Sequence, residues 1–300
     1  MVNDVEIQRL ALIKYMFNTA LEQSKQPEPL CGLSILTFHD CIELFLIFAL
    51  EKLTGNKQDK GFSDYWEPIS QKLGRPLTGR EEMQRLNKSR VNFKHYGILP
   101  STLDIEGYRS SCMNFLKENT NPIFGIEFES ISLISLVKYP DVQSRLQTAA
   151  KLMSEGNLQE AINDIGIAFQ IMINDYMRRK TTNSGRSPFF FGESMKYESG
   201  HSLSTSDKDL KRFVDKTRRS IDSIQEALKI ISLGMDFRRY VKFDYLTPFI
   251  SQMASGRYVV DIDSRQSPIT IEDCEFCMNF VIDSSLKLQE FDYNTKFGLC

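Results

Sequence analysis

The sequence lacks the glycine and serine signatures of several common enzyme classes. It has no P-loop, no glycine pattern for a dinucleotide and no Gly-x-Ser-x-Gly turn, so the usual nucleotide hydrolases and esterases are excluded. Histidine occurs only three times. Cys274 and Cys277 have zinc-like spacing, but no second Cys/His pair accompanies them, so we expect them to pack within a helix. We therefore expect neither a metal nor another cofactor.

An excess of positive charge is also missing. The chain has 37 Lys and Arg against 39 Asp and Glu, a formal net charge of −2, so a polyanion such as RNA must be bound by a local basic patch. The six cysteines are scattered, and the opening MVNDVEIQRL has neither the basic nor the apolar region of a secretory signal. We therefore expect reduced thiols and a cytoplasmic location.

One apolar run, from Leu33 to Leu50, is long enough to resemble a membrane span. His39, Asp40 and Glu43 lie in its middle, and each would be costly in lipid. This run is therefore predicted to be a buried core helix, with no membrane partner.

Helical periodicity covers almost the whole chain, so the predicted fold class is all-α. Residues 127–139 are the one stretch that also has strand character, and a Ser/Thr/Gly-rich loop with an apolar tip at Phe189–Phe191 follows residue 180. The expected helices are 5–23, 33–53, 63–73, 79–97, 103–119, two within 142–180 that break near Gly156 and Asn157, 207–233, 236–253 and 271–291.

Two domains are expected, at residues 1–125 and 126–300. Cys-Met-Asn-Phe occurs at 112–115 and again at 277–280, and RVNFKHYGILP can be aligned with YVKFDYLTP at 240–248. The second domain is therefore either a degenerate copy of the first or an unrelated helical domain. In a copy, Tyr240 and Tyr245 would replace Arg90 and His95.

Arg90 interrupts the apolar stripe of the helix at 79–97. Its guanidinium leaves from the face that carries Met83, Leu86 and Phe93, and a buried arginine needs a partner. We expect Arg90 to lie near Glu43 or Asp40. If only the charges are considered, the simplest interpretation of Arg90 and His95 is structural. Arg90 would form an ion pair that joins two helices, and His95 would stabilise the end of its helix.

The spacing of Arg90 and His95 permits a chemical role as well. Five residues place the two side chains about 140° apart on a helix, so they flank one groove. With Asn92 and Lys94, that groove would offer a permanent cation, an amide, an ammonium and an imidazole. Such a set suits a phosphodiester.

LNKSRVNFKHYG, following the acidic and apolar FHDCIELFLIFALEKL, resembles the Arg-x4-6-His motif of the HEPN superfamily (higher eukaryotes and prokaryotes nucleotide-binding). The resemblance covers residues 1 to 125 and implies a helical-bundle, metal-independent endoribonuclease that cleaves single-stranded RNA or tRNA. It also implies a prokaryotic toxin or antiviral defence role, with an antitoxin or defence-system protein as a partner.

The resemblance implies roles for six residues. His95 would exchange protons, Arg90 would stabilise charge on the phosphorane, Lys94 and Asn92 would position phosphate or sugar, and Glu43 or Asp40 would hold Arg90. The products would be a 2′,3′-cyclic phosphate and a 5′-hydroxyl. Val91 departs from the family pattern, because active members often carry Asn, Asp or His directly after the arginine.

Basic clusters in the second domain are candidate RNA-binding residues, and the nearby Phe189–Phe191 could stack on bases. The clusters could equally be solvated helix ends. They comprise Arg178, Arg179, Lys180, Arg238 and Arg239. Of the other histidines, His39 is expected to be hydrogen-bonded in the core and His201 to be exposed.

Three functional hypotheses remain open. An active HEPN-type nuclease would pair two motifs, either in a homodimer or in an intramolecular pseudo-dimer with one active motif. A non-catalytic HEPN-like module would bind nucleotide or protein as a scaffold. A tetratricopeptide-like protein, suggested by LMSEGNLQEAINDIGIAF, ranks last because no period of about 34 residues is sustained.

Overall fold

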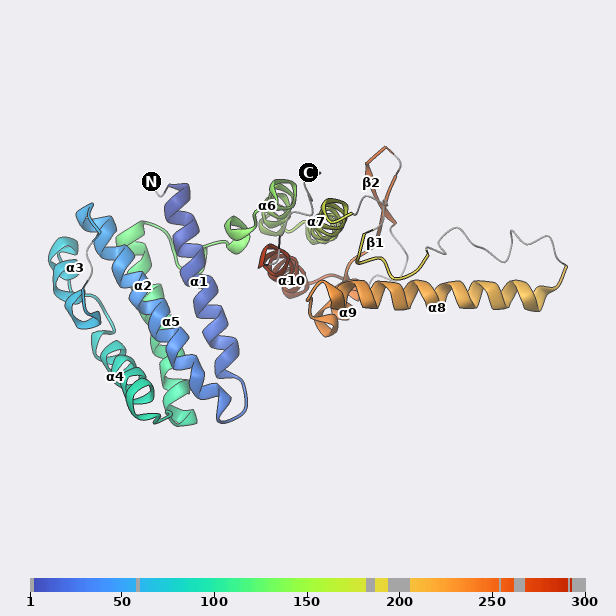
Figure 1. The fold of residues 1–300 in the computed structure, drawn as a ribbon. Coiled ribbons are helices and arrows are strands. Elements are labelled where there is room, and N and C mark those ends of the chain that lie inside the picture. The colour runs from blue at the N-terminus through green and yellow to red at the C-terminus, as the bar shows by residue number, and fades with distance from the viewer. Residues whose placement is uncertain are drawn as a thin grey trace, which may run out of the picture. The chain divides into compact units, whose positions relative to one another are not determined.

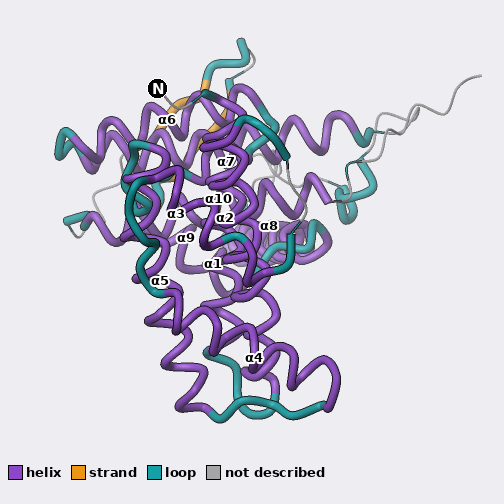
Figure 2. The backbone as a smooth tube through the Cα atoms, turned by 90° about the vertical axis from the view of Figure 1, so that its left-hand side faces the viewer, coloured by secondary structure: helices purple, strands orange, loops and turns teal. Residues whose placement is uncertain are grey.

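The computed structural model describes residues 3–57, 60–181, 187–193, 206–253, 255–261, 268–290 and 292. These residues form ten α-helices and a single two-stranded sheet (Figures 1 and 2). The predicted all-α class is confirmed. The chain divides into two compact units, Met1–Leu136 (unit 1) and Val137–Cys300 (unit 2).

Unit 1 is a bundle around one central helix. Helix α2 packs against all four other helices of the unit and buries apolar side chains along its length. The helices are α1 (Asp4–Ser24), α2 (Ser34–Thr54), α3 (Trp66–Leu73), α4 (Arg80–Tyr96) and α5 (Thr102–Phe124).

The apolar run predicted to form a core helix does so. By length and composition Leu30–Thr54 could cross a membrane, with a mean hydropathy of 1.9, but 61% of its most apolar window is buried inside the protein. Phe38, Ile42, Phe45 and Leu46 are fully buried in a core shared with α1 and α5. In this structure α2 therefore packs as the core helix of unit 1.

Local sequence signals position α4 and α5. Helix α4 ends at Gly97, whose φ of 68° lies in the left-handed region that glycine adopts readily, as predicted. It begins at Arg80 after Gly79, one residue later than expected. Helix α5 starts with a capping box in which Ser101 and Asp104 satisfy each other's backbone N–H groups.

Unit 1 extends beyond the expected boundary at residue 125. Helix α5 stops at Phe124, but Phe128 and Ile131 join the same hydrophobic core and a 3-10 helix at Leu133–Leu136 packs on α1. The division therefore falls after Leu136. Residues 127–139 form turns and this 3-10 helix rather than a strand.

The described residues of unit 2 form five helices and a β-hairpin. Strands β1 (Phe249–Gln252) and β2 (Tyr258–Asp261) pair antiparallel, with Ile250 opposite Val260. The expected helix at 236–253 is wrong in its second half, because Thr247 is extended before Pro248 and proline disfavours a helical residue before it. The helices are α6 (Pro140–Ser154), α7 (Leu158–Arg179), α8 (Lys208–Ser232), α9 (Phe237–Leu246) and α10 (Ile271–Glu290).

The two units share an order of helix packing. Helix α7 packs against α6 and α10 as α2 packs against α1 and α5, and α9 packs against α10 as α4 packs against α5. Ring centroids of Phe45 and Phe115 lie 5.3 Å apart, and those of Phe169 and Phe280 lie 5.6 Å apart. Phe115 and Phe280 are the matched phenylalanines of Cys-Met-Asn-Phe; whether the second domain is a degenerate copy or an unrelated helical domain stays a prediction with both alternatives.

Candidate active site on the second and fourth helices

Arg90 is half-buried on α4, and its Nε atom is buried. Among the described residues this Nε has no hydrogen-bond partner, and no ion pair within 4.0 Å links Arg90 to Asp40 or Glu43. The expectation that Arg90 lies near Glu43 or Asp40 is thus not accompanied by an ion pair; both carboxylates lie within 4.0 Å of His39. Arg90 instead lies close enough to His39 of α2 to lower the pKa of that imidazole.

His39 is the buried centre of a polar group on α2, as its interpretation as a hydrogen-bonded core histidine predicted. Its side chain is 2% exposed, Nε2 lies 3.0 Å from Oδ1 of Asn87, and Nδ1 lies 3.4 Å from Asp40 and 3.9 Å from Glu43. The ring stacks on Phe62 with centroids 4.6 Å apart. The group therefore joins α2 to α4.

The charge of His39 is set by its surroundings. Burial lowers its pKa from 6.5, the nearby Glu43 carboxylate raises it, and the Arg90 guanidinium lowers it again. The neutral imidazole is therefore favoured in the folded protein.

A metal ion is the one cofactor for which this group has candidate ligands. Ligand atoms of His39, Asp40 and Glu43 lie within 4.8 Å of one another, and a neutral imidazole with two carboxylates is a common donor set for divalent ions. The guanidinium of Arg90 beside His39 opposes a second positive charge there. His39, Asp40 and Glu43 thus have the atoms to bind a metal ion, but the positive charge of Arg90 disfavours a cation at this place.

His95 lies in the last turn of α4, away from the His39 group. His95 and Lys94 are exposed, whereas Asn92 is half-buried. Five residues along a helix correspond to a rise of about 7.5 Å and a rotation of about 140°. Arg90 is directed towards α2 while His95 is open to solvent, and no hydrogen bond joins these two described residues.

The surface next to His95 is apolar, which sequence reasoning missed. Tyr96 is 74% exposed and Leu103 is 78% exposed, with Ile98 and Leu99 between them also exposed. Leu99 packs over Gly32, where an added Cβ would lie 2.7 Å from Leu99 Cδ2. The run YGILPSTL carried this signal, because its large apolar residues have no helical or strand period.

Asn87 is the other residue that sequence reasoning missed. It precedes Arg90 by three residues on α4 and therefore lies on the same face of the helix. This spacing was visible in the sequence. The partner on α2 was not, because the rotation of α4 against α2 depends on packing.

The basic residues proposed to bind RNA differ in solvent exposure and in their ion pairs. Lys180 is 1% exposed and its Nζ lies 2.8 Å from Asp292, so burial removes it from an RNA-facing set. Arg179 also pairs with Asp292, at 3.0 Å, and Arg178 with Asp175, at 2.8 Å.

The second basic cluster, Arg238 and Arg239, also contains one residue held in an ion pair. Arg239 pairs with Asp283 at 2.7 Å, whereas Arg238 is exposed. Ring stacking on RNA could come from Phe190 and Phe191, which are exposed. Phe189 instead contacts Tyr176, with ring centroids 5.8 Å apart. His201 lies outside the described residues.

Cys274 and Cys277 are both buried in α10, as helix-packing residues. Burial raises the pKa of Cys274 to about 11 and that of Cys277 to about 12, so both remain thiols near neutral pH. A thiolate is the form that binds a metal. Helix packing therefore explains this pair.

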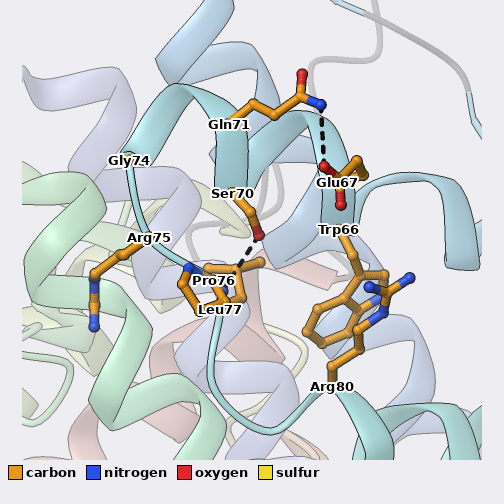
Figure 3. A pocket seen from close by; sticks show the side chains of 9 residues that line it. All are labelled: Trp66, Glu67, Ser70, Gln71, Gly74, Arg75, Pro76, Leu77 and Arg80. Carbon is orange, nitrogen blue, oxygen red and sulfur yellow. Dashed lines mark hydrogen bonds between the residues drawn. The ribbon is translucent and has the colours of Figure 1, made fainter.

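A separate pocket of about 420 Å³ lies between α3 and the start of α4 (Figure 3). Within it Gln71 donates to Glu67, and the hydroxyl of Ser70 accepts from the backbone N–H of Leu77. Neither Arg90 nor His95 lines it. The lining residues are Trp66, Glu67, Ser70, Gln71, Gly74, Arg75, Pro76, Leu77 and Arg80.

Searches of protein-family models, curated proteins and solved structures gave no match to this chain.

Proposed function

We propose that unit 1 is a metal-independent endoribonuclease of HEPN type that cleaves single-stranded RNA or tRNA, in a prokaryotic toxin or antiviral defence system. The observation that carries the proposal is the state of Arg90. Arg90 is half-buried and its buried Nε has no hydrogen-bond partner among the described residues, a state that the Nε atoms of Arg109 and Arg218 share. Buried donors are almost always satisfied, so an orphaned one is a reason to expect a ligand.

The charge of Arg90 selects the class of ligand. A guanidinium binds carboxylate or phosphate oxygens through paired N–H donors, and the neighbouring His39 is neutral by burial. On the same helix the exposed Lys94 lies about one turn further along, and the exposed His95 about one and a half turns. The proposal therefore requires an RNA that extends from Arg90, on the side of α4 that faces α2, to the imidazole and ammonium at the exposed end of the helix.

The proposed reaction is an internal transesterification. The RNA 2′-hydroxyl attacks the adjacent phosphorus and loses its proton, the bond to the 5′-oxygen breaks, and that oxygen gains a proton. His95 exchanges these protons, and Arg90 stabilises charge on the phosphorane oxygens. Lys94 and Asn92 position the backbone. The products are a 2′,3′-cyclic phosphate and a 5′-hydroxyl.

The remaining polar residues position Arg90. Asn87 and His39 fix α4 against α2, and Glu43 and Asp40 supply negative charge on the His39 side of the group. One His95 cannot serve as base and acid simultaneously. A homodimer that provides a second His95 meets this need, whereas an intramolecular pseudo-dimer would supply Tyr245.

The test is cleavage of total RNA in the presence of EDTA. Wild-type protein should degrade RNA, and Arg90→Ala and His95→Ala should not. Lys88→Ala is the matched control, because it removes an exposed cation from the same helix and should leave cleavage intact. Equal treatment of RNA by wild type and both site variants contradicts the proposal.

A non-catalytic scaffold is the second candidate function, favoured by the apolar surface beside His95. Tyr96, Ile98 and Leu103 are all more than half exposed, and such surfaces bind proteins more readily than RNA. For a scaffold, Leu103→Asp would abolish partner binding while Arg90→Ala would leave it unchanged.

A further inference from the structure

Helix α8 carries an uninterrupted heptad pattern. Seven positions alternate in steps of four and three, and six of them are apolar; they are Leu210, Val214, Thr217, Ile221, Ile224, Leu228 and Ile231. The helix has 25 residues, a length of about 37 Å. A period of 3.5 over three heptads indicates a helix that packs against another helix along its length.

The seam formed by these seven residues is largely open to solvent. Leu210 is 44% exposed, Ile224 58%, Leu228 40% and Ile231 54%, while Val214, Thr217 and Ile221 are half-buried. Of the residues of α8, all of which the structure describes, only Ile230 is buried. Exposed apolar surface of this extent on one helix indicates a docking surface.

The hydrogen bonds that α8 makes with other described residues of unit 2 come from residues outside the seam. Glu226 accepts a hydrogen bond from the hydroxyl of Tyr240 on α9, and Gln225 donates to the carbonyl groups of Phe191 and Glu193. Neither residue belongs to the seam. These contacts therefore hold α8 in unit 2, while four of the seven seam residues remain exposed.

We propose that the seam binds the seam of α8 from a second copy of this chain, in an antiparallel coiled coil. A second copy supplies a helix of the same length and period. On one flank of the seam Ser220 and Ala227 are small and Phe213 is apolar and 65% exposed. On the other flank Gln225 is held by the carbonyl groups of Phe191 and Glu193. No acidic side chain occupies a flanking position beside the two basic ones, Lys211 and Arg218.

The charge distribution along α8 selects the antiparallel orientation. Residues 208–219 contain six basic and two acidic side chains, a formal charge of +4, whereas residues 220–232 contain one basic and two acidic side chains, a charge of −1. A parallel pair would place two strongly positive halves within a Debye length, about 8–10 Å, of each other. The antiparallel pair places each positive half against a slightly negative one.

Cross-linking between two full-length chains tests this directly. One chain carries Lys211→Cys and the other Ser232→Cys, and both carry Cys300→Ser; the five described native cysteines are buried. In the antiparallel pair the two new thiols flank the same side of the seam near its ends. A bismaleimide should therefore link the mixed chains, and absence of this product overturns the proposal.

Two further variants show whether the apolar seam holds the pair together. Ile224→Glu places a charge in the seam and should reduce the cross-linked fraction at least tenfold. Ser223→Glu adds the same charge at the adjacent exposed position outside the seam and should not. Cross-linking that survives Ile224→Glu, with helicity unchanged by circular dichroism, contradicts the proposal.

This pairing does not depend on the nuclease proposal. Arg90→Ala should leave the cross-linked fraction unchanged, since Arg90 lies in unit 1 and the seam in unit 2. Failure of RNA cleavage and failure of cross-linking are therefore separate results.

Discussion

His39 of α2 and Asn87 of α4 are joined across the helix interface, with Nε2 and Oδ1 3.0 Å apart. The contact lies one turn before Arg90 on α4, and it is made by a side chain that is almost completely buried. It therefore fixes the helix that carries the proposed catalytic residues. Protonation or replacement of the His39 imidazole should therefore affect the packing of α4 on α2.

Removing the amide should destabilise unit 1. In Asn87→Leu the buried Nε2 of His39 loses its partner, and an unsatisfied buried group costs about 1–3 kcal/mol. Urea unfolding followed by fluorescence reports on this unit, because Trp66 is the only tryptophan of the chain. Lys88→Ala, at the next and exposed position, should leave the transition in place. An unchanged midpoint in Asn87→Leu would show that the contact adds no stability.

Stability should fall as the pH falls below 6.5 because of His39. Burial lowers the pKa of His39 in the folded protein from 6.5, so the unfolded chain binds more protons between the lowered pKa and 6.5. The free energy of unfolding therefore rises with pH through this window. The stabilisation that comes from keeping His39 neutral is complete above pH 6.5.

The comparison that isolates this effect is wild type against His39→Gln at pH 7.5 and pH 5.5. The glutamine can still hydrogen-bond Asn87 but does not titrate. Wild type should lose more stability than the variant on acidification, measured by the urea midpoint of the Trp66 signal. Equal losses in the two proteins would mean that His39 does not titrate differently on unfolding.

The paired phenylalanines of each unit should be strong contributors to its core. Phe45 is fully buried against Phe115 and Phe124, and Phe45→Ala should cost about 3–5 kcal/mol. The adjacent Leu44 is 38% exposed, so Leu44→Ala should cost much less. Urea unfolding of Trp66 distinguishes the two, and similar shifts would show that Phe45 is not a core anchor.

The corresponding change in unit 2 is Phe169→Ala. Phe169 contacts Phe243 and Phe280, so a similar cost of about 3–5 kcal/mol is expected. It should appear in the helical circular dichroism transition. The Trp66 transition should move less than it does in Phe45→Ala, because Trp66 belongs to unit 1.

Features set by local chain chemistry could be predicted from the sequence. Gly97 ends α4, Gly156 separates α6 from α7, and the apolar character of α2 places it in the core, all as expected. The hairpin after Leu246 was not predicted, because the amphipathic pattern of α9 continues into residues that Pro248 prevents from being helical.

The candidate site was less predictable, because it depends on how helices rotate against each other. Arg90 was identified from its place on an apolar stripe, but its neighbour is His39 rather than a paired carboxylate. Asn87 was overlooked for the same reason. Lys180 counts as a surface cation in the sequence, yet a carboxylate from Asp292 in the distant C-terminal segment pairs with it in a buried position.

The nuclease proposal requires that Arg90 and His95 of α4 cleave RNA without a metal. Its most direct test is the chemistry of the RNA ends formed in EDTA by wild type and by His95→Ala. Wild type should give 2′,3′-cyclic phosphate and 5′-hydroxyl ends, and His95→Ala should cleave at a rate about 10²–10⁴ lower. Cleavage that requires a divalent ion, or that proceeds at the same rate in His95→Ala, would contradict it.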